Sequence, residues 1–365
     1  MSSQIDDIRS TTDFKGNTFS NFKKTEVKKQ LENNLNQGRI EPSCYWAAEF
    51  ICANQYNALW DILICFYFKH IHTGNVKACV YLKNRMASYT QIAKNGYKDI
   101  EIHMRNSQHI RILFCEVICV LCESKRGRTF TEVKINPENF DLSICVDKFR
   151  APNTEYAIFF DAEKDPKDLF IALNEFSYNI AHNSEDNVMA CYWMEWVVAY
   201  NATCVRNGIV NKCGNRHFAQ VEYKHKSHII WLLWHAIISE SQMREQIVEN
   251  IIQDCFFIYC FNFGTGCVAK RKSIIYFSIS LLTEQFSTSE PIIGDKNKLS
   301  NIIENIDHIY TQIKQNEHST QTEYLFEGMN DSGASSITND LTDTLEKIQL
   351  VDRLERDAYI NGMNC

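Results

Sequence analysis

Four side chains that could bind a metal fall close together in one polar stretch. Residues 204–228 read CVRNGIVNKCGNRHFAQVEYKHKSH and contain Cys204, Cys213, His217 and His225. Thiolate sulfur and imidazole nitrogen are ligands that Zn²⁺ prefers, and Cys213-x3-His217 has the spacing of half a zinc site. The stretch lacks the paired CxxC of the clearest zinc motifs. It therefore predicts either a zinc site completed by Cys204 or His225, or an ordinary polar loop.

The other cysteines favour a packed core. The chain has 15 Cys in 365 residues and opens without a signal-peptide pattern, so we expect buried thiols in a reducing cytosol rather than disulfides. Cys115, Cys119 and Cys122 lie at i, i+4 and i+7 of the apolar segment 109–123 and share one helix face. Such a face is typical of a core, and a metal site there would need ligands from elsewhere.

Two short basic clusters are candidates for binding nucleic acid. They comprise Lys125, Arg126, Arg128, Lys270, Arg271 and Lys272. The second cluster begins an apolar helix, where cations oppose the helix dipole. An acidic partner, a phosphate backbone or plain solvation must therefore stabilise the positive charges at this position. Residues 1–283 carry a net charge of +2 (32 basic against 30 acidic), and residues 284–365 carry −9 (6 against 15). A nearly neutral body argues against broad, non-specific nucleic-acid binding.

Four carboxylates lie inside apolar runs: Glu49, Asp61, Glu116 and Glu195. A buried carboxylate is costly unless it is paired, so we interpret these acids as structural ion-pair or hydrogen-bond partners, with metal binding or catalysis as alternatives. The sequence contains no nucleophile elbow, HExxH, kinase signature or P-loop. These observations favour a non-enzymatic protein and leave a metal-dependent enzyme as the weaker reading.

The hydrophobic pattern predicts a mainly α fold, either a multi-helix bundle or a short helical solenoid. Only 13 Gly and 5 Pro leave little room for the turns of a β fold, and one alternating segment, 129–135, allows at most a minor β element. Cys44-Tyr45-Trp46 recurs as Cys191-Tyr192-Trp193, which raises the alternatives of two related helical halves or of chance. No window is apolar enough to predict a membrane span.

Composition divides the chain into five segments. We expect a disordered arm (1–24), a first helical half (25–160), a second helical half (161–316), a flexible acidic linker (317–339) and a C-terminal amphipathic helix (340–365). The last helix would present Leu341, Leu345, Ile348, Val351 and Leu354 to a partner or to its own domain. The amphipathic segment 295–313 would close the fold or pair with another chain, which includes a second copy of this one.

Several blocks of the chain resemble an uncharacterised family of the nucleocytoplasmic large DNA viruses, the mimivirus and algal-virus group. The blocks are EPSCYWAAEFICANQYNALWDI, FYFKHIHTGN, FCEVICVLCESKR, KDLFIALNEF, NVMACYWMEWV and IIWLLW. This resemblance implies a virus-encoded protein that acts with other viral proteins in the host cytoplasm, in the viral factory, or in the virion. It assigns no catalytic residue.

The stretch SCYWAAEFICANQYNALWDI is also similar to a helix in the helical collar of clamp-loader-related ATPases, although the ATPase motifs are absent from this sequence. Such a collar drives oligomerisation and contacts replication partners. The sequence thus predicts a helical viral interaction protein, an accessory to viral DNA replication or transcription. The alternative is a structural, minor capsid-associated component of the virion.

Overall fold

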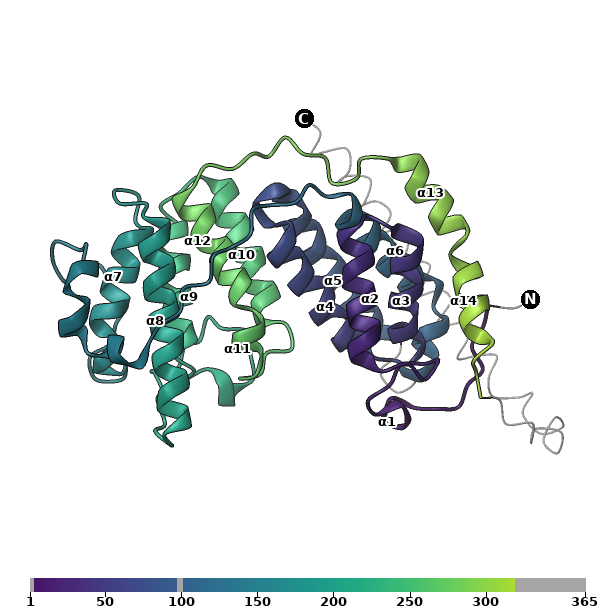
Figure 1. The fold of residues 1–365 in the computed structure, drawn as a ribbon, viewed down its shortest axis with the longest axis horizontal. Coiled ribbons are helices and arrows are strands. Elements are labelled where there is room, and N and C mark those ends of the chain that lie inside the picture. The colour runs from purple at the N-terminus through teal and green to yellow at the C-terminus, as the bar shows by residue number, and fades with distance from the viewer. Residues whose placement is uncertain (1–2, 97–100, 319–365) are drawn as a thin grey trace. The chain divides into compact units, whose positions relative to one another are not determined.

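The computed structural model describes residues 3–96 and 101–318, which fold almost entirely into helices (Figure 1). Within these residues there are fourteen α-helices and six short 3₁₀ helices, and no strand. The mainly α prediction is therefore confirmed. Residues 129–135 are extended but join no ladder, and the β pairing in the described part is limited to two isolated bridges, Asn17–Lys23 and Lys212–His228.

Part of the expected C-terminal organisation lies outside the described residues. These end at residue 318, so nearly all of the linker 317–339 and the whole helix 340–365 fall beyond them. The partner-binding role predicted for the five apolar residues of that helix stays a prediction.

The chain divides into two compact units, which differ from the contiguous halves expected at 25–160 and 161–316. Unit 1 takes its described residues from 1–67, 81–125 and 289–365, and unit 2 takes its residues from 68–80 and 126–288. Each unit therefore combines stretches that are far apart in sequence. Composition could not reveal this, because packing decides compactness and segments distant along the chain can share one core.

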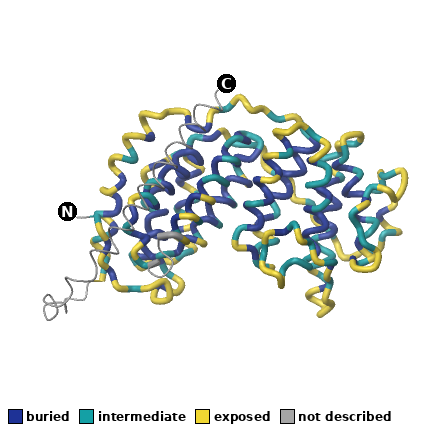
Figure 2. Tube along the Cα trace, turned by 180° about the vertical axis from the view of Figure 1, so that it is seen from behind, coloured by how far each residue is buried: buried dark blue, intermediate teal, exposed yellow. Residues whose placement is uncertain are grey.

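Unit 1 is built around the apolar helices that the hydrophobic pattern predicted. Its elements are α1 (Thr11–Phe14), α2 (Lys24–Asn36), α3 (Ile40–Cys52), most of α4 (Tyr56–His70) and of α5 (Lys77–Gly96), η2 (Glu101–Asn106), α6 (Gln108–Glu123), α13 (Lys296–Glu304) and α14 (Ile306–Lys314). Helix α3 packs against α2, α6 and α14. The core of unit 1 contains Trp60 and Phe114, whose ring centroids are 4.9 Å apart. Figure 2 shows that buried positions concentrate in the helices and exposed ones in the connections.

The N-terminal arm, expected to be disordered, packs into unit 1 over residues 3–24. Phe14 and Phe19 are buried, and together they contribute roughly 3–6 kcal/mol of hydrophobic stabilisation. The carboxylate of Glu49, fully buried in α3, accepts hydrogen bonds from the Thr18 hydroxyl at 2.9 Å and from the Ser20 amide at 2.9 Å and hydroxyl at 2.5 Å. Apolar burial and a satisfied carboxylate thus offset the entropy cost of ordering the arm.

The amphipathic segment 295–313 closes unit 1 as two helices rather than one. Asn305, with φ −98° and ψ 3°, separates α13 from α14. Helix α14 is held by Arg111 of α6, whose guanidinium lies 3.0 Å from the Asp307 carboxylate and 3.9 Å from the Tyr310 ring centroid. The same guanidinium donates to the Ser3 carbonyl, so the N-terminal arm and α14 share one buried arginine.

Unit 2 carries a second set of buried helices. Its elements are η1 (His72–Gly74), η3 (Pro137–Phe140), η4 (Leu142–Lys148), η5 (Lys167–Leu169), α7 (Phe170–Ile180), α8 (Asn187–Arg206), η6 (Tyr223–His225), α9 (Ile230–Ser241), α10 (Gln246–Cys260), α11 (Cys267–Lys270) and α12 (Lys272–Thr283). Helix α8 packs against α7 and α12, and α9 packs against α7 and α10. Asp186 caps α8 by accepting from the Met189 amide at 3.0 Å, a role that aspartate commonly takes before a helix.

The extended segment after α6 is fixed in unit 2 by a buried histidine. The Nε2 atom of His72 lies 2.6 Å from the Arg128 carbonyl oxygen, and its ring stacks on Phe130 with centroids 4.2 Å apart. Gly127, the residue before Arg128, lies directly against the His72 imidazole. A Cβ at Gly127 would lie 2.5 Å from His72 Cε1 and 2.5 Å from the Ile71 carbonyl oxygen, so this position has no room for a side chain.

The two Cys-Tyr-Trp helices have similar neighbours but different details. Helix α3 packs on α2 and α6, and α8 packs on α7 and α12 in the same order along the chain. In both helices the adjacent Tyr and Trp rings are nearly perpendicular, at 86° for Tyr45–Trp46 and 87° for Tyr192–Trp193. The buried acid, however, follows the tryptophan by three residues in Glu49 and by two in Glu195, so the two acids leave their helices in different directions.

Candidate functional site: a groove in unit 2

The four predicted zinc ligands do not converge. Over residues 3–96 and 101–318, no group of three or more His, Cys, Asp or Glu side chains could hold a metal ion. The Cys213 thiol instead donates to the His228 carbonyl oxygen at 3.4 Å, and burial raises its pKa to about 12, which opposes the thiolate that zinc needs. Cys204 is buried in α8, His217 is exposed, and the His225 ring packs edge-on against Phe263. The structure therefore does not bring the four side chains together, and Cys213 and His225 make other contacts instead.

The first basic cluster is largely engaged in ion pairs. Lys125 belongs to unit 1 and its ammonium lies 3.1 Å from the Glu290 carboxylate. Arg128 belongs to unit 2 and forms an ion pair with Glu284 at the end of α12. Both cations remain more than half exposed, so these pairs contribute little to stability and leave the charges reachable from solvent.

The second basic cluster is mostly structural. The Arg271 side chain is buried and donates to the carbonyl oxygens of Tyr259 at 2.9 Å and Phe261 at 2.5 Å, at the C-terminal end of α10. The Lys272 ammonium binds both oxygens of the Glu195 carboxylate, at 2.7 and 3.0 Å. Arg271 therefore cannot contact a phosphate, which contradicts its predicted role, and Lys272 is committed to an internal acid. Lys270 is exposed.

Two of the acids that lie inside apolar runs, Glu195 and Glu116, have partners within the fold. Glu195 accepts from the Tyr276 hydroxyl at 2.8 Å in addition to Lys272. A carboxylate oxygen of Glu116 lies 3.6 Å from the Arg85 guanidinium, with both side chains buried. These contacts agree with the interpretation of these acids as structural partners.

A surface groove in unit 2 has mixed apolar and polar walls. It has a volume of about 810 Å³, within the range of ligand-binding pockets. Three separate segments line it: the turn between α7 and α8, the turn between α9 and α10 with the first residues of α10, and the end of α12 with the residues after it. Its apolar lining includes Met243, Ile247, Leu281 and Phe286. Met243 is 80% exposed and Ile247 is 42% exposed, so apolar surface is presented to solvent.

Arg244 holds the walls of this groove in place. Its guanidinium donates to Glu240 at 3.0 Å, to Glu185 at 2.6 Å and to the Ile180 carbonyl oxygen at 3.0 Å. These bonds join the end of α7, the turn before α8 and the end of α9. Glu185 also lies 2.8 Å from His182 Nδ1, and the hydrogen bond from Arg244 lowers the pKa of Glu185. The groove is therefore preformed by a charged network rather than by loops alone.

The lining of the groove is acidic. It contains three carboxylates, Glu185, Glu245 and Glu284, against one guanidinium, Arg244, which leaves a net charge of −2 when His182 is neutral. Glu185 forms an ion pair with Arg244, and Glu284 forms one with Arg128, so Glu245 is the lining carboxylate best placed to receive a cation. Apolar side chains next to this carboxylate suit a ligand that combines apolar groups with a cation.

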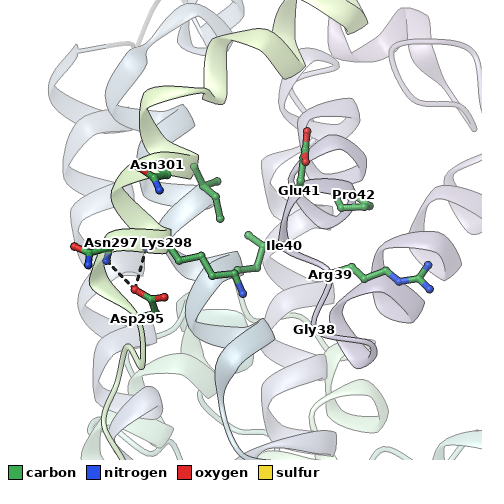
Figure 3. Close-up of a pocket in the computed structure, with 10 residues that line it drawn as sticks. Gly38, Arg39, Ile40, Glu41, Pro42, Asp295, Asn297, Lys298 and Asn301 are labelled. Carbon is green, nitrogen blue, oxygen red and sulfur yellow. Dashed lines mark hydrogen bonds between the residues drawn. The ribbon is translucent and has the colours of Figure 1, made fainter.

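A second pocket lies in unit 1 between the start of α3 and helix α13 (Figure 3). It has a volume of about 540 Å³, and its charged lining is balanced: Arg39 and Lys298 against Glu41 and Asp295. Asp295 caps α13 by accepting from the amides of Asn297 and Lys298 (Figure 3). Lys298 also lies 3.4 Å from Glu123. Asp295 and Lys298 already serve the local structure, so this pocket offers weaker recognition chemistry than the groove.

Comparison with models of known protein families, with curated proteins and with solved structures finds no match for this chain. The resemblance to a viral family therefore stays a prediction. Among the described helices, none is both long enough and apolar enough to cross a membrane.

Sequence reasoning missed the groove. Its turn reads SESQMREQ around Met243, a polar stretch that looks like an ordinary helix connection. The available signal was the pair of apolar residues Met243 and Ile247 on either side of Arg244 and Glu245. That pattern becomes informative only when three distant segments are seen to meet.

Proposed function

We propose that this protein is a non-enzymatic helical interaction protein whose unit 2 groove binds a short amphipathic segment of another viral protein. The observation that carries the proposal is the exposed apolar surface of Met243 and Ile247 inside a preformed, acidic recess. Exposed apolar side chains that gather in a polar-rimmed groove are typical of protein-binding sites.

The groove defines the chemistry of its partner. Apolar side chains of the partner would replace water over Met243, Ile247 and Phe286, and a lysine or arginine would approach Glu245. Burial of a few such side chains is the usual source of affinity, while the charge pair sets specificity and the association rate. The binding segment would therefore be apolar and basic, in contrast to the acidic chain itself.

The biological setting follows from the resemblance to large DNA virus proteins. We propose an accessory role in viral DNA replication or transcription in the host cytoplasm. A minor capsid-associated role in the virion is the alternative, and the identity of the bound protein separates the two.

A crosslinking experiment tests the groove directly. A photo-crosslinking amino acid would replace Met243 in the tagged full chain, expressed in infected cells, with nuclease present during purification. Met243→Asp places a charge on the apolar surface, and Ile158→Asp is the matched control, because Ile158 is 85% exposed in unit 2 and does not line the groove.

We expect the partners that the crosslinker at position 243 captures to co-purify, without crosslinking, with the parent chain and the Ile158→Asp control, and to be lost from Met243→Asp. Replication or transcription proteins among them would support the accessory role, and capsid proteins would support the virion role. If Met243→Asp retains every partner of the parent chain, the groove is not the binding site.

A further inference from the structure

Two pairs of buried cysteine thiols lie in contact inside the protein, one pair in each unit. In unit 1, Cys44 of α3 and Cys115 of α6 have their sulfur atoms 3.8 Å apart. In unit 2, Cys79 of α5 and Cys255 of α10 have theirs 3.6 Å apart. All four side chains are at most 3% exposed. None of the cysteines in the described residues forms a disulfide.

These contacts join residues that are far apart in sequence. Cys44 and Cys115 are separated by 71 positions, and Cys79 and Cys255 by 176. Each pair links two different helices, so a covalent bond would close a long loop. A disulfide has a sulfur–sulfur distance of about 2.05 Å, so each pair must close by roughly 1.5–1.8 Å. Side-chain rotation with a small shift of one helix supplies a movement of that size.

We propose that Cys44–Cys115 and Cys79–Cys255 are two reversible disulfide-forming sites that respond to peroxide. Two other buried thiols, those of Cys260 and Cys213, contact backbone groups rather than a second thiol. Cys260, in the same helix as Cys255, interacts with the backbone of Gln220, and Cys213 bonds to the His228 carbonyl oxygen. Proximity to a second thiol is what makes disulfide formation available to the two pairs.

The reaction is balanced with hydrogen peroxide as the oxidant. One sulfur, as its thiolate, attacks a peroxide oxygen; the O–O bond breaks, and a sulfenic acid and one water form. The second sulfur then attacks the sulfenic sulfur, which forms the S–S bond and releases the hydroxyl as a second water. Two thiols are oxidised by two electrons, and one peroxide is reduced to two waters. A dithiol reductant reverses the change.

Burial sets the rate of this response. It raises the pKa of the Cys79 thiol well above the ordinary value. At Cys115 the hydrogen bond with Cys119 lowers the pKa, but the contact with Cys44 and burial outweigh it, so this pKa is also well above the ordinary value. Little thiolate is therefore present at neutral pH. Oxidation therefore proceeds slowly, through openings of the helices that admit the oxidant. The pairs would register sustained oxidation rather than a brief pulse.

The unit 1 pair has a third thiol within reach. Cys119 follows Cys115 by one helical turn and hydrogen-bonds to it. Oxidised Cys115 therefore has two neighbours that could complete a disulfide, whereas Cys79 has Cys255. We expect the α3–α6 bond to form in preference, because an i, i+4 disulfide within one helix would distort α6.

Mass spectrometry of the oxidised full chain tests this proposal. The folded protein would be treated with hydrogen peroxide, its remaining thiols blocked with N-ethylmaleimide, and the non-reduced digest searched for linked peptides. We expect the 44–115 and 79–255 linkages, and a rise in Tm of about 5 °C that dithiothreitol reverses. Cys44→Ala and Cys255→Ala should each remove their own linkage, while Cys260→Ala is the control and should keep both.

Two results would overturn the proposal. One is oxidation confined to the partly exposed Cys65 and Cys267 with no linked peptide. The other is a random set of linkages equal to that of the urea-unfolded chain, which would show that proximity in the fold does not direct the chemistry.

Discussion

Lys272 decides between two interpretations of the basic cluster at the start of α12. Sequence makes it a candidate phosphate contact, whereas the structure places its ammonium 2.7 and 3.0 Å from the oxygens of Glu195. The informative change is Lys272→Met, which keeps the length of the side chain and removes its charge. The Glu195 carboxylate, 6% exposed, would then keep the Tyr276 hydroxyl but lose its counter-ion.

The expected cost follows from burial. Removing one partner of a buried charge pair destabilises a protein by about 3–5 kcal/mol. The Lys272 side chain is 21% exposed, so solvent screens the pair and the lower end, about 3 kcal/mol, applies. Lys272 also begins α12, where a cation opposes the helix dipole, and removing it returns about 0.5 kcal/mol. Lys272→Met should therefore lower the free energy of unfolding by about 2.5 kcal/mol.

Urea unfolding followed by circular dichroism measures this loss. Lys270→Met is the control, since Lys270 is exposed at the end of α11, and it should change the free energy of unfolding by less than about 0.5 kcal/mol. The double variant Glu195→Gln/Lys272→Met should cost less than the sum of the two single changes, because no unpaired charge remains.

Duplex DNA binding across a salt series completes the comparison. A Lys272→Met variant as stable as the parent chain would refute the internal pair. If that variant also bound DNA more weakly with a flatter salt dependence, the phosphate-contact interpretation would replace it. Alanine at Lys270, Arg271 and Lys272 together is a poor test, because loss of the buried Arg271 would destabilise α10 and confuse folding with binding.

Two further predictions concern His72 and His228, and the glycine that lies beside His72. Burial lowers the pKa of His72 and His228 from 6.5 to about 4, so the unfolded chain binds protons at these residues before the folded chain does. Their contribution to stability is therefore complete above about pH 6.5 and is lost as the pH falls toward 4, by up to about 3 kcal/mol each. The Tm measured from pH 7.5 to 4.5 should fall, and His228→Asn should make Tm depend less on pH. An unchanged slope in that variant would remove His228 from the explanation. Gly127→Ala should lower the free energy of unfolding, measured in urea, by about 2–3 kcal/mol, because the new Cβ meets the His72 ring. Gly266→Ala is the control and should be nearly neutral, because its Cβ meets nothing within 4 Å. Equal losses of stability in the two variants would contradict the steric argument.

The sequence anticipated the helices well where their signals are local. The apolar period of 109–123 corresponds to α6, and Asp186 and Asp295 cap the helices that they precede. The acidic residues inside apolar runs were expected to be structural, and Glu49, Glu116 and Glu195 have hydrogen-bond or ion-pair partners. These features depend on residues within a turn or two of each other, so a linear sequence contains them.

Other expectations failed where a distant contact overrides the local pattern. Asp165-Pro166 has the residue types of a helix start, and the 3₁₀ turn η5 does begin at Lys167 and lead into α7. The Asp165 carboxylate does not cap it, because it binds the Gly214 amide at 3.0 Å and the Arg216 guanidinium at 2.5 Å. Residues 3–24 look disordered by composition, but Phe14 and Phe19 find a core in unit 1. The zinc spacing of Cys213 and His217 is present in sequence and absent in space.

What the sequence determined by itself is therefore the class of fold, the position of most helices and the burial of the cysteines, because hydrophobic periodicity and propensity act over short distances. Only the tertiary structure decided which charges meet, which thiols touch and where apolar surface remains exposed. Glu195 meets Lys272 across 77 positions, and Cys79 meets Cys255 across 176. The groove needs three segments at once, around residues 182, 243 and 286. These contacts between distant residues are determined by how the helices pack, and helix packing depends on the whole core rather than on any one stretch of the chain.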